Sequence, residues 1–282
     1  MKPAPFRMYA PHTVAQAVAT LAALEAEGQH AKVLAGGQSL VPVLAMRLAE
    51  PGHLVDINGV AGLDAIDVSS AGVRVGALVR HAELLRHAEA NRVQPLLSQA
   101  LNLVAHATIR NRGTTVGSLA HADPSGEMTA VSVRGEREIP AAEFFVGPLE
   151  SSLAADELAL SAFFPAAPAG AGTAFVEMAR RHGDYALSGV GAVVIPGPSR
   201  DEGAPTISVS CGFLSVSETP LVLDLSDAWA AGEDSVMAVV RAAIDPQDDI
   251  HASADYRRHI TGILAVRAIR EALARVREEQ AA

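Results

Sequence analysis

The first part of the chain alternates between helical and strand-like hydrophobic patterns. Apolar residues at helical spacing follow Thr13, a favourable N-cap residue, and continue to Gly28, which predicts a first helix. A short apolar run at 32–35 predicts a buried strand that stops at two glycines, and helical spacing returns over 40–48. A second apolar run at 53–57 completes a predicted strand–loop–helix–strand unit with a glycine-rich loop.

The middle of the chain predicts a hairpin, two helices and an irregular stretch. Apolar runs at 65–68 and 73–75, separated by small and polar residues, predict the hairpin. Residues 82–90 and 95–105 carry helical patterns. Residues 108–128 have small side chains and no clean period, so we expect a long irregular segment, which is usually functional in a compact domain.

Strand patterns dominate the next part of the chain, and helices close it. The expected strands are residues 137–139, 157–164, 174–178, 186–194 and 206–213. A stretch rich in Pro, Gly and Ala at 165–172 is the best candidate linker, and 196–205 predicts a turn. Helical patterns return from Glu233, with a last helix from about Ala254. This order predicts an α+β architecture.

Composition excludes several classes of function. The 282 residues are 49% hydrophobic and 19% charged, which fits one or two globular domains and excludes disorder. A net charge of −10 argues against a nucleic-acid binder. The single cysteine excludes an internal disulfide, a four-cysteine zinc site and a self-contained iron–sulfur cluster. No apolar run is long enough for a membrane span, and no signal peptide is expected, so we expect a cytoplasmic protein.

Two loops of small residues are candidates for binding a phosphate-bearing ligand. Residues 35–39 follow a predicted strand and precede a predicted helix, and adjacent glycines let backbone N–H groups converge on an anion. Residues 113–119 again combine glycines and hydroxyls. The alternatives are a plain tight turn for the first and a self-packed loop for the second. Neither is a Walker A loop or a G-x-G-x-x-G dinucleotide motif.

Other reactive residue types give weaker signals. His121 and Asp123 lack further ligands at metal-binding spacing, so a structural role is favoured. Ser39 lacks the frame of an activated nucleophile, and Cys211 lies in an apolar strand pattern that is typical of a buried residue. Residues 180–185 predict a charged turn, either a solvated hairpin or a basic and aromatic group over a ligand.

Six stretches match the pattern of one known family. They are residues 34–42, 53–57, 109–114, 118–124, 180–186 and 256–259, within a match from Ala4 to about Leu273. On these residues the chain resembles the FAD-binding medium subunit of the molybdenum hydroxylases, a group that includes carbon monoxide, xanthine, nicotine and caffeine dehydrogenases.

The resemblance implies a fold and a domain division. The expected fold is α+β: a two-subdomain flavin-binding fold of the vanillyl-alcohol-oxidase type, followed by a C-terminal domain with a small antiparallel sheet and helices. The implied FAD-binding domain covers residues 1–168, with subdomains of about 1–57 and 58–168. The C-terminal flavoprotein-type domain covers residues 172–282.

The resemblance also implies ten FAD-contacting positions but no catalytic residue and no metal site. The first pyrophosphate loop would comprise Ala35, Gly36, Gly37, Gln38 and Ser39, the second would comprise Thr114, Gly117 and Ser118, Asp123 would contact the ribose or adenine side, and Tyr185 would pack near the isoalloxazine ring.

The implied function is electron transfer through FAD. A molybdopterin-binding large subunit would oxidise the substrate, and a small subunit with [2Fe–2S] clusters would pass electrons to the FAD of this chain for delivery to an acceptor. One alternative is a divergent stand-alone protein with altered or lost flavin binding that performs non-redox chemistry, such as a cyclisation or isomerisation in secondary metabolism. Another is a structural subunit whose flavin site has decayed.

Two departures from the family pattern favour these alternatives. Val116 stands where the second loop normally has its first glycine, and valine is costly if that position needs a positive φ. The segment 128–138 is also shorter than expected for the family.

Overall fold

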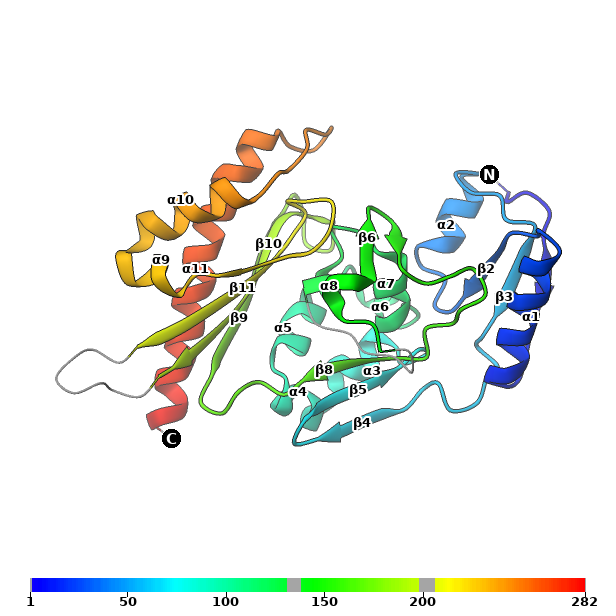
Figure 1. Ribbon diagram of the computed structural model, residues 1–282, viewed down its shortest axis with the longest axis horizontal. Coiled ribbons are helices and arrows are strands. Elements are labelled where there is room, and N and C mark those ends of the chain that lie inside the picture. Colours follow the sequence, from blue (N-terminus) through cyan, green and yellow to red (C-terminus); the bar gives the residue numbers. More distant parts are fainter. Residues whose placement is uncertain (1, 131–137, 198–205, 282) are drawn as a thin grey trace.

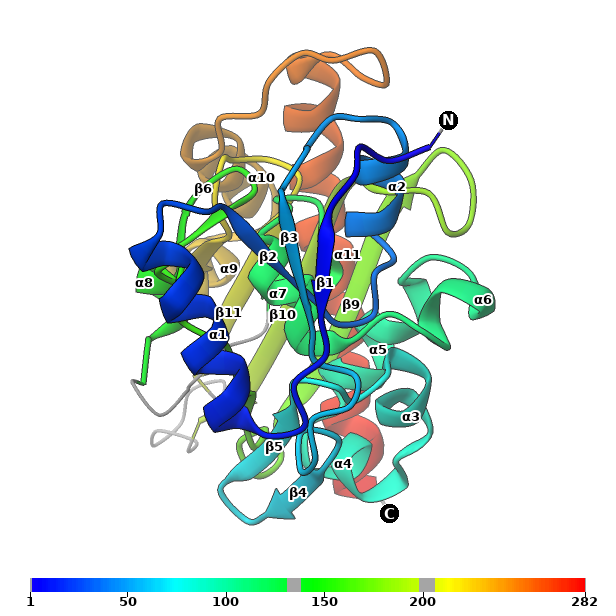
Figure 2. The same ribbon diagram turned by 90° about the vertical axis from the view of Figure 1, so that its right-hand side faces the viewer.

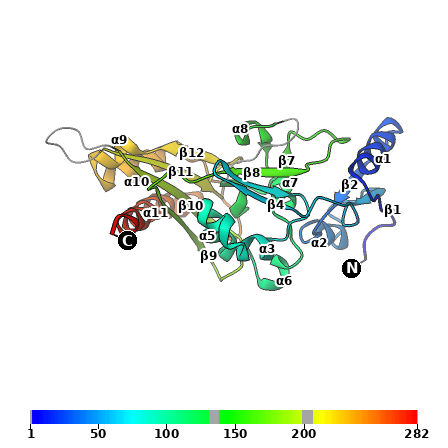
Figure 3. The same cartoon turned by 90° about the horizontal axis from the view of Figure 1, so that it is seen from below.

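The elements form three groups in a row along the long axis of the molecule (Figures 1 and 3). The structure is a computed structural model that describes residues 2–130, 138–197 and 206–281. The N-terminal group lies at one end, the C-terminal group at the other, and the middle of the chain between them.

The N-terminal group is a small parallel sheet with helices. Strands β1 (Arg7–Tyr9), β2 (Ala31–Leu34) and β3 (His53–Asp56) pair in the order β1-β3-β2, with α1 (Val14–Ala26) and α2 (Leu40–Ala45) in the connections. Figure 2 looks onto this end of the molecule. The predicted strand–loop–helix–strand unit is confirmed, because the two parallel strands need a crossover connection and the glycine-rich turn leads directly into its helix.

The middle group packs short helices against an antiparallel sheet. Its sheet has the order β4-β5-β8, with β4 (Ile66–Ser69), β5 (Gly72–Gly76) and β8 (Ser161–Pro165). Its other elements are α3 (His81–Arg86), α4 (Ala88–Val93), α5 (Leu96–Leu103), α6 (Ala107–Arg110), α7 (Thr115–His121), the 3₁₀ turn η1 (Glu127–Ala130), α8 (Ala141–Phe144), β6 (Phe145–Gly147) and β7 (Glu150–Ser151).

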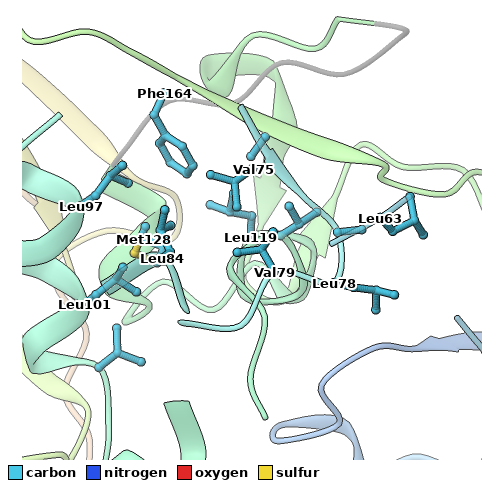
Figure 4. Packing of buried hydrophobic residues seen from close by; sticks show 14 of the residues in the cluster. Leu63, Val75, Leu78, Val79, Leu84, Leu97, Leu101, Leu119, Met128 and Phe164 are labelled. Atoms are coloured by element: carbon cyan, nitrogen blue, oxygen red, sulfur yellow. The ribbon is translucent and has the colours of Figure 1, made fainter. Parts of the chain in front are cut away.

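One hydrophobic core holds the middle group together and continues into the N-terminal group. Figure 4 shows side chains from β5, α5, α7 and β8 turned toward a common interior, among them Val75, Leu97, Leu119 and Phe164. Each buried side chain of this size contributes about 1.5–3 kcal/mol, so this core fixes the loops between its elements.

The C-terminal group is a four-stranded antiparallel sheet covered by helices. Strands β9 (Gly172–Ala179), β10 (Ala186–Pro196), β11 (Ile207–Leu214) and β12 (Leu221–Asp224) pair in the order β12-β11-β10-β9. The helices are α9 (Ser226–Ala231), α10 (Glu233–Ala243) and α11 (Ala254–Ala281). Helix α11 packs along β9 and β10, and a second core forms between the helices and the sheet.

Helix α11 approaches the sheet closely through small residues. A Cβ atom on Gly172, at the start of β9, would overlap the backbone carbonyl oxygen of Ala272. Ala265, Ala268 and Ala272 are fully buried along the same helix. Small side chains therefore bring the helix backbone into direct contact with the strand.

The expected α+β fold is confirmed, but several predicted elements are wrong in detail. The helix expected over 82–90 is split at His87, because the Nδ1 atom of this residue accepts a hydrogen bond from the N–H of Ala90 at 3.2 Å and caps a new helix. The segment expected to be irregular, 108–128, contains part of α6, all of α7 and the start of η1. Short capped helices of this kind lack enough turns to show a period.

Strand predictions were least accurate around the linker and the chain turns. The strand expected over 157–164 begins only at Ser161, and residues 138–139 form no strand. Strand β12 and helix α9 were not predicted. Arg137, most of the expected turn at 196–205 and most of the segment 128–138 lie outside the described residues.

Candidate functional site

The turn between β2 and α2 is a cradle of backbone N–H groups. Gly37 has a φ of +71°, a left-handed conformation that favours glycine. Within the described residues, the N–H groups of Gly36, Gly37, Gln38 and Ser39 donate to no backbone carbonyl. Free, converging N–H donors of this kind bind anions.

The second candidate stretch is a helix start rather than a loop. Thr114 is the N-cap of α7, and its hydroxyl accepts the N–H of Gly117 at 3.2 Å. The expectation of a second open loop is therefore wrong for residues 115–121, because the cap and the buried side chain of Leu119 fold them into α7. Thr114 itself is buried, with its hydroxyl already engaged.

The two stretches meet directly. A Cβ atom on Gly36 would overlap the carbonyl oxygen of Arg112 and lie 2.8 Å from the Cα of Gly113. A Cβ atom on Gly117 would lie 3.9 Å from the Cβ of Ala35. The glycines therefore let two backbone segments, far apart in sequence, lie side by side at the end of β2.

A buried histidine supports the second stretch from behind. The N–H of His81 donates to the carbonyl of Gly113 at 2.9 Å, and its Nδ1 lies 3.3 Å from the hydroxyl oxygen of Thr115. Burial, together with the nearby charge of Arg110, lowers the pKa of His81 to about 4. His81 is therefore neutral at physiological pH and acts as a fixed support.

Val116 is a core residue of α7. Its side chain is only 3% exposed and packs in the core of the middle group, and its φ is not positive. The expectation that valine is strained here is wrong, because a helical backbone accepts any L-residue.

We therefore expect Val116→Gly to destabilise the protein by about 3 kcal/mol, since it removes a buried side chain and places glycine inside a helix. It should not tighten FAD binding. The measurements are chemical denaturation and an FAD titration. Val239→Gly is the matched control: Val239 is a helical valine of α10 that is 41% exposed, and its replacement should cost only about 1 kcal/mol. Tighter FAD binding by Val116→Gly would contradict this expectation.

Tyr185, between β9 and β10, joins the N-terminal turn to the end of α7. The side chains of Asp123 and Ser39 lie close enough to its hydroxyl to affect its pKa. Desolvation of the phenol, the carboxylates of Asp123 and Glu127, and the hydrogen bond to Asp123 raise the pKa of Tyr185 to about 12, although 58% of the residue is exposed. The hydroxyl thus stays protonated, and three predicted site residues from three parts of the chain meet at one point.

Two further carboxyl groups lie beside this point. Burial, with the nearby charges of Glu177 and Asp123, raises the pKa of Glu127 to about 7. Burial also raises the pKa of Glu177 to about 7, and its Oε2 atom is buried without a hydrogen-bond partner in the described part of the chain. The region near Tyr185 is therefore acidic and partly protonated at neutral pH, and a phosphate would be repelled from it.

The structure also gives findings on metal-binding groups, membrane spans and Cys211. Among the described residues, no group of three metal-ligating side chains is present, and no helix is long and apolar enough to cross a membrane. Cys211 is buried in β11, and desolvation raises the pKa of its thiol to about 12. It therefore packs as a small apolar residue and is not a thiolate at neutral pH.

Comparison with known proteins identifies the family. The model of the FAD binding domain in molybdopterin dehydrogenase matches residues 4–167, and that of the CO dehydrogenase flavoprotein C-terminal domain matches residues 173–272. This chain is an FAD-binding medium subunit of the molybdenum hydroxylase family. The medium subunit is 38% identical over 296 residues to the 6-hydroxypseudooxynicotine dehydrogenase complex subunit alpha of Paenarthrobacter nicotinovorans, covering 98% of this chain and 97% of the relative.

Solved structures of oxidoreductases share the fold of the medium subunit. A chain of carbon monoxide dehydrogenase from Hydrogenophaga pseudoflava superposes with a TM-score of 0.85 at 32% identity, covering 98% of this chain and 99% of that chain. A chain of quinoline 2-oxidoreductase from Pseudomonas putida 86 has a TM-score of 0.85 at 30% identity, with 98% and 99% covered. The expected family, fold and FAD cofactor are thus confirmed.

The residues present fit FAD. The free N–H groups of Gly36–Ser39 suit a pyrophosphate, and the missing side chain of Gly36 lets the segment at Arg112 and Gly113 pack directly against this turn. The acidic region around Tyr185 suits hydroxyl and N–H donors, such as those of a ribose or a flavin ring, rather than phosphate oxygens.

Sequence reasoning missed five residues that shape this site. They are Asn58, Arg80, His81, Glu127 and Glu177, which bond or face the predicted positions. Only Asn58 carried a local signal, because Asp-x-Asn after a strand is typical of a side-chain-stabilised turn. The others are single polar residues in helical or strand patterns, and only the tertiary fold brings them to the site.

Proposed function

We propose that this chain is the electron-transfer subunit of a molybdenum-containing hydroxylase or dehydrogenase. A molybdopterin-binding large subunit would oxidise the substrate and reduce the [2Fe–2S] clusters of a small subunit. This chain would receive the electrons from those clusters and pass them to an acceptor. The observation that carries the proposal is the cradle of free N–H groups at Gly36–Ser39, opposite the start of α7, in a chain of this FAD-binding family.

We assign the ten predicted positions to parts of the cofactor. Ala35, Gly36, Gly37, Gln38 and Ser39 would hold the pyrophosphate, with Thr114, Gly117 and Ser118 on its other side. Asp123 would accept hydrogen bonds from the ribose or adenine side, and Tyr185 would border the isoalloxazine ring. FAD, when bound, supplies the group that accepts and releases electrons.

The side chains of the site keep defined protonation states and orient the groups around them. The protonated hydroxyl of Tyr185 lies near Ser39 and Asp123, while Thr114 caps α7 and so orients its first turn. Neutral His81 supports Gly113 and Thr115 without adding charge. These groups position the cofactor, and none of them serves as an acid or base for an organic substrate.

The predicted division into residues 1–168 and 172–282 agrees with this assignment. Residues 166–171 join β8 to β9, and Tyr185 lies beyond that connection. The cofactor would thus contact both domains.

The proposal is tested by anaerobic reduction of the reconstituted complex. The purified chain should carry flavin absorbance, and substrate should bleach it only when the large and small subunits are present. Bleaching by substrate that needs no iron–sulfur subunit would contradict the electron route. A chain that never binds FAD would instead support the alternative of a non-redox protein on this scaffold.

We also expect the isolated chain to turn over no organic substrate. Its single cysteine is buried, and no metal-binding cluster occurs among the residues that the structure describes. A steady-state assay with a two-electron organic donor and an artificial acceptor checks this. Addition of the partner subunits should start turnover; steady turnover before their addition would overturn the expectation.

A further inference from the structure

A chain of three hydrogen bonds joins the two backbone segments of the site. The side-chain Nδ2 of Asn58 donates to the carbonyl of Ala35 at 2.8 Å. The Oδ1 atom of Asn58 accepts from Nη2 of Arg80 at 2.7 Å, and Nη1 of Arg80 donates to the carbonyl of Arg112 at 2.6 Å. We call Asn58 and Arg80 the bridge, because they connect Ala35 in the first segment with Arg112 in the second.

Both members of the bridge are held in place by local bonds. The Oδ1 atom of Asp56 accepts from the N–H of Asn58 at 3.0 Å and from its Nδ2 at 2.6 Å, which fixes the turn after β3. The N–H of Arg80 donates to Glu83 at 2.9 Å, and Arg80 pairs with Thr114 in an isolated β-bridge. The side chains are therefore presented to each other in one orientation.

The bridge spans the boundary between the N-terminal and middle groups. The hydrophobic core continues across this boundary, while β1, α1, β2 and β3 make most of their element-to-element contacts with one another. In Figures 1 and 3 this group lies at one end of the molecule, with α7 in the neighbouring group. At this boundary Gly36 lies against Arg112 and Gly113 with no side chain between them, and the bridge is a polar connection between these two segments.

We propose that Arg80 and Asn58 are positioning residues that hold the two FAD-binding segments at a fixed separation and thereby set the affinity for FAD. The inference rests on the proposed site at these segments. The planar guanidinium is suited to this role, because two of its nitrogens point to two different oxygens at once. Without the bridge, the segments must be ordered when the cofactor binds, and binding weakens.

The test is FAD binding to the full-length apo-chain. Arg80→Ala and Asn58→Ala should each raise the Kd for FAD about tenfold or more, as expected for hydrogen bonds that involve a charged group. Because the two residues form one connection, the Kd of the double variant should exceed that of the weaker-binding single variant by no more than about threefold. Additive losses, or an unchanged Kd in Arg80→Ala, would overturn the inference.

Two further variants separate positioning from charge and from folding. Arg80→Lys keeps the positive charge but lacks the planar guanidinium with two donor nitrogens, so its Kd for FAD should remain close to that of Arg80→Ala. If the Kd of Arg80→Lys returned to that of the parent, charge alone would matter and the inference would be overturned. Arg74→Ala is the matched control, since Arg74 lies in the same group, bonds Ser161 at 3.2 Å and stacks on Phe163, away from both segments. Its Kd should equal that of the parent.

Thermal unfolding of the apo-chains completes the design. A bridge that acts on FAD affinity should leave the Tm of Asn58→Ala, an exposed residue, close to that of the parent while the Kd rises. If the Tm falls as the Kd rises, the bridge is a contact that stabilises the whole fold, and the inference is overturned. A parent chain that fails to bind FAD would refute the proposed function instead.

Discussion

Gly36→Ala is expected to raise the Kd for FAD about tenfold or more and so to lower the FAD content of the purified chain, because a shift of the two segments costs at least about 1.4 kcal/mol of binding free energy. The new Cβ would overlap the carbonyl oxygen of Arg112 and lie 2.8 Å from the Cα of Gly113. Both contacts are backbone atoms, which cannot rotate away as a side-chain tip can. The segments must therefore separate, and the cradle no longer faces α7. Flavin absorbance per mole of protein measures the effect.

Gly52→Ala is the matched control for this variant. It adds the same atom in the same N-terminal group, but a Cβ at Gly52 meets nothing within 4 Å, and its φ is not positive. Its flavin content should equal that of the parent. If Gly36→Ala also keeps full flavin content and affinity, the junction between the segments plays no part in holding FAD.

Glu127→Gln is expected to stabilise the apo-chain above pH 7 by about 2–3 kcal/mol, the cost of ionising a buried carboxyl whose pKa is raised to about 7. Between its unfolded pKa of 4.5 and about 7, the native state of the parent binds more protons than the unfolded state. The free energy of unfolding of the parent therefore falls as the pH rises through this window. The glutamine variant lacks this loss, because its side chain of similar shape carries no charge.

Urea denaturation at several pH values between 4 and 9 measures this difference. The free energies of unfolding of the parent and of Glu127→Gln should be equal near pH 4 and should differ increasingly toward neutral pH. Glu89→Gln is the control, since Glu89 is an exposed residue whose carboxylate lies 3.9 Å from Arg92. Its stability should follow that of the parent at every pH. A stability difference between Glu127→Gln and the parent that does not change with pH would show that folding does not raise the pKa of Glu127.

Local sequence patterns were sufficient to predict the elements whose hydrophobic period and glycine positions are clear. The unit around Gly36 and Gly37 was predictable because two short apolar runs, a glycine pair and a helical period follow in order. Helix α7 was not predictable, because its small residues show no helical period. Its start depends on the hydroxyl of Thr114 and on the burial of Val116. The sequence therefore predicted the strand–turn–helix unit around Gly36 and Gly37 better than the helical shape of residues 115–121.

The polar contacts of the site were beyond sequence reasoning for a different reason. Arg80 and Asn58 are 22 positions apart, and Glu127 and Glu177 lie in different groups of elements. Whether such residues pair, or whether a carboxyl is buried enough to keep its proton, depends on distances that only the folded chain sets. The family resemblance supplied the ten positions that we propose to contact FAD, but it said nothing of the residues that hold those positions together.

The order of α11 and the strands that it covers has a consequence for biosynthesis. The helix covers β9 and β10, yet it is synthesised after them and starts about 80 residues after the start of β9 on the numbering of the two elements. Until it emerges, the apolar face that includes Val190 and Ala192 has no cover, and the nascent sheet is prone to aggregation. A nascent chain that stops short of Ala272 lacks part of this core, so the domain completes its fold only once α11 has been synthesised.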